Sequence, residues 1–321
     1  MELTSFIDVL AQPLNAFFIS QSSLYWPYLI SAFFIAIGLS AISAFVSKQS
    51  FTRLLGEQFS KRIWWGASTR IDYLYFALNT ILFGSLIAPL MLASIDMGVW
   101  VHETLKQVFG PNPTLEWDAG TARIIYTVCF FVAYDFGRFF AHWLQHQFDV
   151  LWQFHKVHHS AEALTPFTSF RVHPVDLFLM GMGGNLFGGF MTGIFFYLTN
   201  GEITVATFLG THVLIAVYSL IGNLRHSHVW LDYGVLGYVF ISPAQHQIHH
   251  SLSAHHIGKN CGFALAFWDG LFGTLYVPKQ KEDFTMGLGD GTDGTWHTLS
   301  ALYLRPFVLA LQSIQSKKWR A

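Results

Sequence analysis

Residues 124–141 read IIYTVCFFVAYDFGRFFA, and residues 142–159, which follow directly, read HWLQHQFDVLWQFHKVHH. The first part is an apolar run close to the ~20 residues that cross a bilayer as a helix. The second part spaces its histidines by three or four residues, beginning with His142 and His146. Residues at these offsets project from one side of a helix. The stretch therefore predicts a membrane helix that ends in imidazoles aimed at one point.

The composition of the whole chain also indicates a membrane protein. Of its 321 residues, 52% are hydrophobic, 17% aromatic and only 12% charged, and the mean hydropathy is +0.40. A soluble domain carries roughly 25% charged residues, so this chain has too little polar material to cover a water-soluble surface. The net charge of −1 gives no reason to expect nucleic acid as a partner. We expect an all-α, polytopic integral membrane bundle.

Five apolar runs approach or reach the length of a membrane helix: 24–46, 73–101, 124–141, 177–198 and 203–222. The last two are joined by Thr199-Asn200-Gly201-Glu202, a turn signal. We therefore expect them to form a tight antiparallel hairpin that either spans the bilayer or re-enters it.

The basic residues predict the orientation. The loop 47–72 contains five of them, whereas the residues before the first run contain none. By the positive-inside rule the loop 47–72 is cytoplasmic, and alternation then places 142–176 and everything after 223 on the same side. We expect a multi-pass protein of a bacterial inner membrane, or of the endoplasmic reticulum in a eukaryote, with a histidine-rich cytoplasmic cap.

Histidine is abundant and concentrated in one part of the chain. Of sixteen histidines, all but His102 and His297 lie between residues 142 and 256. They form one HxxxH box at 142–146 and two HxxHH boxes, at 155–159 and 246–250. Neutral imidazole is the commonest protein ligand for borderline transition metals. Eight or more such ligands exceed the four of one zinc ion, so the pattern predicts two metal ions, which also keep the crowded imidazoles neutral.

Two ionisable residues precede the first box on the same helix face. Asp135 and Arg138 continue the spacing of His142 and His146. Ionisable residues in a membrane helix usually turn toward a functional interior. We expect Asp135 to accept a hydrogen bond from a ligand histidine and so fix its tautomer; the alternative is a self-neutralising pair with Arg138.

Short sequence elements flank and join the boxes. In chain order they are His142-Trp-Leu-Gln-His146, His155-Lys-Val-His158-His159, Phe170-Arg-Val-His173-Pro174, Arg225-His226-Ser227, Ser242-Pro243, His246-Gln-Ile-His249-His250, Asn260-Cys-Gly262 and Trp268-Asp269-Gly-Leu-Phe-Gly273-Thr274. Their order and gaps, over about residues 124–278, resemble the fatty acid hydroxylase/sterol desaturase superfamily, and bacterial sterol desaturase family proteins look most similar.

The resemblance implies a di-iron centre that uses dioxygen and two external electrons to hydroxylate or desaturate a lipid. The implied metal ligands are His142, His146, His155, His158, His159, His226, His228, His246, His249 and His250. Supporting residues or possible further ligands are Asp135, His173, His255, His256, Asn260 and Asp269. The chain has no cysteine cluster for iron–sulfur and no glycine-rich nucleotide loop. The electrons are therefore expected from a separate donor of cytochrome b5 or ferredoxin type, and the lipid from the bilayer.

Three regions are expected: N-terminal transmembrane helices at 1–123, the catalytic domain at 124–278, and a tail at 279–321. Residues 298–314 of this tail have helical apolar spacing, which suits either a membrane surface or a packed soluble helix. Two other functions stay open. A zinc-dependent membrane hydrolase is disfavoured because the boxes contain no glutamate, and a metal carrier because the ligands gather on one side.

Overall fold

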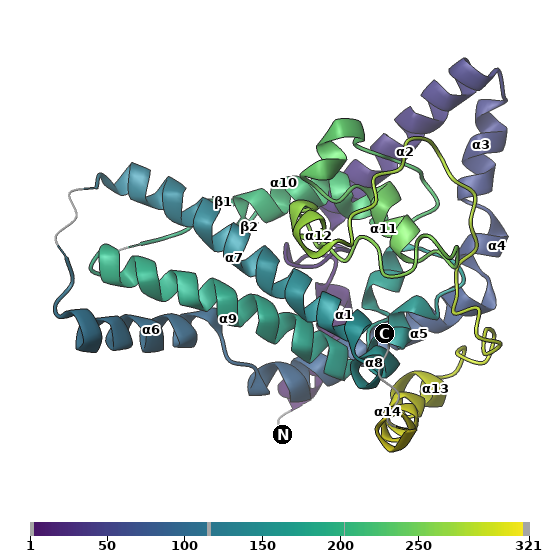
Figure 1. The fold of residues 1–321 in the computed structure, drawn as a ribbon. Coiled ribbons are helices and arrows are strands. Elements are labelled where there is room, and N and C mark those ends of the chain that lie inside the picture. Colours follow the sequence, from purple (N-terminus) through teal and green to yellow (C-terminus); the bar gives the residue numbers. More distant parts are fainter. Residues whose placement is uncertain (1–2, 114–116, 202, 317–321) are drawn as a thin grey trace.

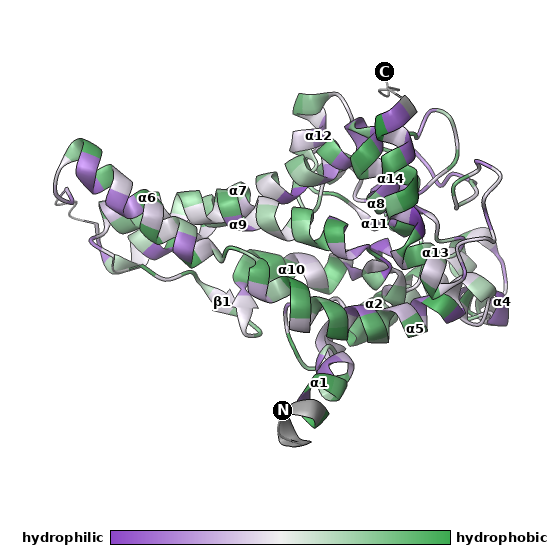
Figure 2. Cartoon of the chain, turned by 90° about the horizontal axis from the view of Figure 1, so that it is seen from below, coloured by the Kyte–Doolittle hydropathy of each residue, from purple (hydrophilic) through white to green (hydrophobic). Residues whose placement is uncertain are grey.

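The computed structural model describes residues 3–113, 117–201 and 203–316, and it is mostly helical (Figure 1). Four helical stretches are long and apolar enough to cross a membrane: α2 (Trp26–Ser47), Ala67–Phe109, α7 (Ala119–Gln147) and α9 (Pro174–Leu198). Hydrophobic residues cover much of α2 (Figure 2), where Phe45 is 88% exposed. Apolar surface of this extent marks an interaction site or a membrane contact. The expected all-α class with long apolar helices is confirmed.

The second apolar run is not one continuous helix, as we had expected for 73–101. It comprises α5 (Ala67–Leu82), a π-helical turn η1 (Phe83–Ile87), a short 3-10 helix η2 (Ala88–Leu90) and α6 (Ser94–Phe109). Pro89 lies where the helix ends, and proline lacks the N–H that a helix interior needs. A new helix begins after Ala93, whose backbone N–H donates to Asp96.

The fifth apolar run is not a membrane-length helix either, so the expected helical hairpin with α9 is wrong. Residues 207–212 form a small antiparallel pair, β1 (Thr207–Phe208) and β2 (Thr211–His212), before α10 (Val213–Gly222). Leu209 and Gly210, between the strands, both have positive φ, as a two-residue hairpin turn requires. The shorter helix α10 packs against α2.

Helices α6, α7 and α9 form a layer that extends to one side of the molecule (Figure 1). Glycines let these backbones approach closely. A Cβ added to Gly137 of α7 would lie 2.1 Å from the carbonyl oxygen of Gly183 on α9, and one added to Gly193 would lie 2.4 Å from Val101 of α6. Small residues at helix interfaces are a common packing device in membranes. The glycines of α9 therefore fix its position between α6 and α7.

The remaining elements gather at the opposite end of this layer. They are α1 (Leu3–Asn15), α3 (Phe51–Gln58), α4 (Lys61–Trp64), α8 (Asp149–His159), η3 (Pro166–Phe170), η4 (Asn223–Arg225), η5 (Gly234–Tyr238), α11 (Pro243–His249), α12 (Phe267–Phe272), α13 (Leu299–Tyr303) and α14 (Arg305–Ser316). Helix α14 packs on α8, where Phe307 contacts Phe154 at a ring separation of 5.2 Å. The C-terminal helix thus covers the helix that carries the second histidine box, while Leu311 and Ile314 stay exposed.

Candidate metal centre

The three histidine boxes meet because of how α7, α8 and α11 join. Helix α7 ends at Gln147, and α8 starts two residues later at Asp149, so the chain turns sharply at Phe148. This turn brings the second box back toward the first. Helix α11 is capped by Ser242, whose side chain accepts a hydrogen bond from the N–H of Gln245, and Pro243 occupies its first position. The helix then presents the third box to the other two.

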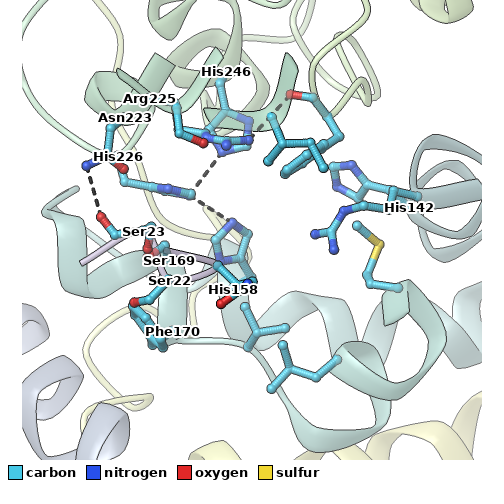
Figure 3. Close-up of a pocket in the computed structure, with 18 of the residues that line it drawn as sticks. Ser22, Ser23, His142, His158, Ser169, Phe170, Asn223, Arg225, His226 and His246 are labelled. Atoms are coloured by element: carbon cyan, nitrogen blue, oxygen red, sulfur yellow. Dashed lines mark hydrogen bonds between the residues drawn. The ribbon is translucent and has the colours of Figure 1, made fainter. Parts of the chain in front are cut away.

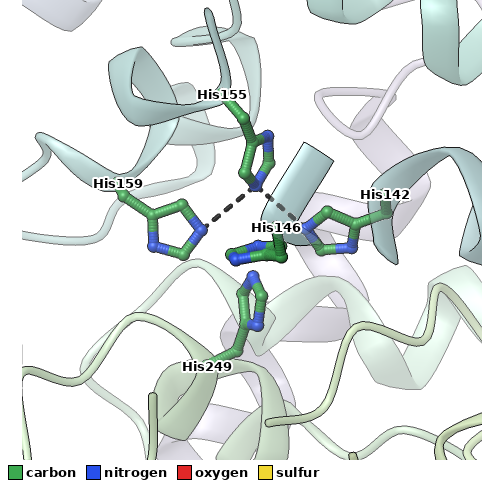
Figure 4. Close-up of side chains that lie close together, drawn as sticks. All are labelled: His142, His146, His155, His159 and His249. Atoms are coloured by element: carbon green, nitrogen blue, oxygen red, sulfur yellow. Dashed lines mark hydrogen bonds between the residues drawn. The ribbon is translucent and has the colours of Figure 1, made fainter. Parts of the chain in front are cut away.

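Five imidazoles form the first group, which we call the five-histidine group: His142, His146, His155, His159 and His249. Their ligand atoms all lie within 4.8 Å of one another. The Nε2 atom of His155 is 2.9 Å from Nε2 of His142 and 3.1 Å from Nε2 of His159. Figure 4 shows the five rings pointing inward to a common centre.

Four imidazoles form the second group, the four-histidine group: His158, His226, His246 and His250. The Nε2 atom of His226 lies 3.2 Å from that of His158 and 3.0 Å from that of His246 (Figure 3). The two groups adjoin, because the rings of His159 and His250 stack at 4.7 Å. Each HxxHH box therefore divides: its i,i+4 pair enters one group and its third histidine the other.

The geometry of both groups fits metal ions. Two nitrogens bound at about 2.1 Å to one ion, at right angles, lie about 3.0 Å apart, which matches the Nε2 separations in both groups. The Nε2 of His249 and both ring nitrogens of His250 are buried without a hydrogen-bond partner among the described residues. Buried polar atoms normally have a partner. An ion at each centre would give His249 Nε2 and one ring nitrogen of His250 a partner.

The electrostatics favour the neutral ligand form of imidazole. Burial, reinforced by the charge of His155, lowers the pKa of His158 and His249 to about 3. Burial and neighbouring histidines hold the pKa values of His159, His226 and His250 well below the usual range. A neutral ring keeps a lone pair for a metal. The site is therefore built to bind cations at neutral pH.

A sequence profile of the fatty acid hydroxylase family matches residues 127–274. This range contains both histidine groups. Over this stretch the chain is similar to the fatty acid hydroxylase family. The expectation drawn from the motifs at 124–278 is thereby confirmed.

Three relatives show how widely this family acts. An ornithine lipid hydroxylase of Rhizobium tropici is 32% identical over 155 residues, 48% of this chain and 43% of its own. An alkylglycerol monooxygenase of Danio rerio is 23% identical over 212 residues, 66% and 43% of the two chains. A Delta(7)-sterol 5(6)-desaturase of Aspergillus fumigatus is 24% identical over 181 residues, 55% and 48%. The matched regions span less than half of these relatives, and no solved structure matches.

Backbone and carboxylate acceptors orient three rings of the five-histidine group. The Nδ1 atom of His155 donates to Asp176 at 2.8 Å, that of His142 to the carbonyl of Cys261 at 2.6 Å, and that of His249 to the carbonyl of Lys259 at 2.7 Å. Such partners fix the tautomer and raise ligand basicity. Sequence reasoning missed Asp176. Its signal was an acidic residue in the first turn of an apolar helix, directly after His173-Pro174.

Asp135 supports the site, but not through a ligand histidine as we had expected. Its carboxylate accepts from the backbone N–H groups of Ala264 and Leu265 and from Trp268 Nε1. It thereby holds the loop that follows the family's Asn260-Cys-Gly262 element. The expected pair with Arg138 is not an ion pair either, since the Arg138 guanidinium lies over the Phe263 ring at 4.2 Å.

Asn260 and Asp269 hold the same loop from its other side. Asp269 accepts from the N–H groups of Cys261 and Gly262, at 2.7 and 2.8 Å, and burial raises its pKa to about 6. Asn260 donates to the carbonyl of Gln245 and accepts from the N–H of Tyr276. Both residues act through the loop whose carbonyls orient the ligand rings.

Four further histidines of the sequence prediction lie outside both groups. His173 caps α9 by accepting from the N–H of Val175, and its Nε2 donates to the carbonyl of Tyr303. His228 accepts from the backbone N–H of Leu164 at 3.3 Å. His255 and His256 share Glu282, at 3.5 and 3.0 Å, in a separate group.

Arg171, of the family's Phe170-Arg-Val-His173 element, ties the site to the rest of the chain. It is fully buried and forms an ion pair with Asp72 of α5 at 2.9 Å. It also donates to Ser160, just after the second box, and to the carbonyl of Trp296. Breaking a buried pair of this kind leaves an uncompensated charge and costs about 3–5 kcal/mol. The histidine-rich region is thus anchored to both the N-terminal helices and the C-terminal tail.

A cavity of about 370 Å³ opens onto both histidine groups (Figure 3). Its lining includes His142 and His155 from the five-histidine group, and His158, His226 and His246 from the four-histidine group. The cavity therefore allows a bound molecule to contact both centres.

Proposed function

We propose that this protein is a membrane-bound, dioxygen-dependent di-iron oxygenase that hydroxylates or desaturates a lipid. One observation carries the proposal: two adjoining groups of five and four buried imidazoles share one cavity. All-nitrogen sites of this kind suit borderline transition metals such as iron. The names of the relatives, which describe a lipid hydroxylase, a monooxygenase and a desaturase, suggest the reaction class.

We assign nine histidines as ligands, one ion to each group, and we leave out His228 because its Nε2 already accepts a backbone hydrogen bond. When bound, the two irons would supply dioxygen activation and hydrogen removal from an unactivated C–H bond. The chain's own residues orient that chemistry. Asp176 and the carbonyls of Cys261 and Lys259 hold the ligand rings.

The proposal includes a place in the cell. Four long apolar helices favour a multi-pass membrane protein, and the basic loop 47–72 supports a histidine site on the cytoplasmic face by the positive-inside rule. A lipid then enters from the bilayer, and a separate cytochrome b5- or ferredoxin-type protein supplies electrons. The regions 1–123, 124–278 and 279–321 act as one unit, because Arg171 contacts Asp72, Ser160 and Trp296.

The test is metal analysis of the full chain purified without oxygen. Two irons per chain, with oxygen consumption when reductant and lipid are supplied, are the expected result. Absence of iron together with no oxygen consumption would refute the proposal, and stoichiometric zinc with ester or amide hydrolysis would favour the hydrolase. Lipid mass spectrometry of cells with and without the gene then separates hydroxylation, which adds one oxygen atom, from desaturation, which removes two hydrogens.

A further inference from the structure

Two arginines line the cavity without a carboxylate partner. The guanidinium carbons of Arg138 and Arg225 lie 4.2 and 4.7 Å from the ring centre of Phe263, so both cations border the same ring. Neither forms an ion pair with any described residue. Arg138 has a buried Nε without a hydrogen-bond partner among the described residues. Arg225 lies over the Tyr218 ring as well and makes one long hydrogen bond, 3.4 Å to the carbonyl of Phe263.

The neighbouring carboxylates already accept hydrogen bonds from other groups. Asp135, three residues before Arg138, accepts from two backbone N–H groups and from Trp268. Asp176 also lines the cavity and accepts from His155. Two cations in a partly buried cavity are costly without an anion. Bound metal ions at the histidine groups would add further positive charge.

The planar guanidinium fork binds carboxylate and phosphate oxygens in pairs. The cavity lining also includes the small polar residues Ser22, Ser169 and Asn223, which Figure 3 labels. The apolar side chains of Met180 and Ile215 line it as well. Its 370 Å³ is near the lower end of small-ligand sites, which measure about 300–1,000 Å³. A headgroup with the start of one chain fits this volume, and a whole two-chain lipid does not.

We infer that Arg138 and Arg225 bind the oxyanion of a lipid headgroup, a carboxylate or a phosphate, and that the lipid is oxidised next to that headgroup. The inference of an anion site depends only on the two arginines and not on the proposed function. The position of oxidation rests on the proposed function, because it follows from the same cavity reaching both histidine groups.

Binding tests the anion site without any turnover. The detergent-solubilised, metal-loaded full chain is titrated with dodecyl phosphate, N-dodecanoylglycine, monododecanoylglycerol and inorganic phosphate, and affinity is read from thermal stabilisation. We expect both anionic amphiphiles to bind at least about tenfold more tightly than the neutral one. Equal affinity for all three amphiphiles would overturn the inference, and inorganic phosphate binding as tightly as dodecyl phosphate would assign the site to a free anion instead.

Variants assign the effect to the two arginines. Arg138→Gln and Arg225→Gln should each weaken binding of the anionic amphiphiles on the order of tenfold, with little change for monododecanoylglycerol. Arg138→Lys and Arg225→Lys keep the charge and should restore part of the loss. Arg123→Gln, exposed on the same helix as Arg138, is the matched control. Unchanged metal content verifies folding, and wild-type affinity in both glutamine variants would contradict the assignment.

The position of oxidation is tested by fragmenting the lipid product in a mass spectrometer. We expect the new oxygen or double bond on the headgroup fragment or the carbons next to it. A change at mid-chain or at the chain end would refute this half of the inference. If the protein binds anionic amphiphiles but consumes no oxygen, the proposed function fails and the anion site stands.

Discussion

The two histidine groups differ in how their rings are held. In the five-histidine group, His155, His142 and His249 donate through Nδ1 to a carboxylate and two backbone carbonyls. In the four-histidine group, the buried Nδ1 atoms of His158 and His246 have no hydrogen-bond partner among the described residues. Outer partners fix ring orientation and strengthen ligands. The five-histidine group is therefore the more rigid of the two.

The two groups also differ in their exposure to the cavity. Three of the four rings in the four-histidine group line it, compared with two of the five in the other group. Arg225, a cation, adjoins His226 in the chain, whereas Asp176, an anion, contacts His155. The comparison indicates that the two groups have different roles. Under the proposed function, one ion would be held tightly by charge and backbone, and the other would face the substrate.

The largest expected effect is loss of a ligand from either group. His249→Ala should remove one ion from the five-histidine group and His246→Ala one from the four-histidine group, each lowering lipid oxidation by more than about a hundredfold, because ligand loss exceeds the 10–100-fold cost of losing an outer partner. Metal content and product formation are the measurements. His297→Ala, whose ring pairs with Glu162 outside both groups, is the control. Retention of two ions by either variant would contradict the assignment.

Next in size is removal of the carboxylate that distinguishes the groups. Asp176→Asn replaces a charged acceptor of His155 with a neutral one, and we expect about 10–100-fold weaker binding of the ion in the five-histidine group. Competition with a coloured chelator measures this affinity. Asp232→Asn, on an exposed loop, should leave it unchanged. If Asp176→Asn lowers the affinity of both groups for their ions equally, the two groups do not differ in the way proposed.

Chelation of the wild-type protein sharpens the comparison further. The ion of the four-histidine group should leave about tenfold faster, because it is more open to the cavity and its rings have fewer outer partners. Metal release is followed over time, and His246→Ala should lack the fast phase. A single release phase in the wild type would contradict the difference between the groups, and a fast phase that disappears only in His249→Ala would reverse the order.

The smallest effect concerns Asp269, which supports the five-histidine group through Cys261. Its folded pKa is about 6 against an ordinary 3.8. The folded state therefore binds more protons than the unfolded state between these values. This difference contributes up to about 3 kcal/mol to the free energy of unfolding. The contribution is present in full below about pH 4 and is lost as the pH rises to about 6. The melting temperature should therefore fall between these pH values in the wild type but not in Asp269→Asn. An equal fall in both proteins would contradict this role of Asp269.

Much of the fold and site could be predicted from the sequence. Composition alone indicated a membrane bundle, and three- and four-residue spacing indicated which histidines share a helix face. The apolar runs 73–101 and 203–222 were interpreted less well. Hydropathy measures polarity and not backbone continuity, so it does not register the break at Pro89 or the positive φ at Leu209 and Gly210.

The sequence by itself determined which imidazoles belong to each box, because their three- and four-residue spacing follows from local residues. Only the tertiary structure decided how they divide. His155 and His159 enter one group while His158, between them, enters the other, because rings on one helix point in different directions and meet different neighbours. Asp176, the loop at 259–265 and the arginine-lined cavity likewise depend on contacts between distant segments. No periodicity along the chain encodes such contacts.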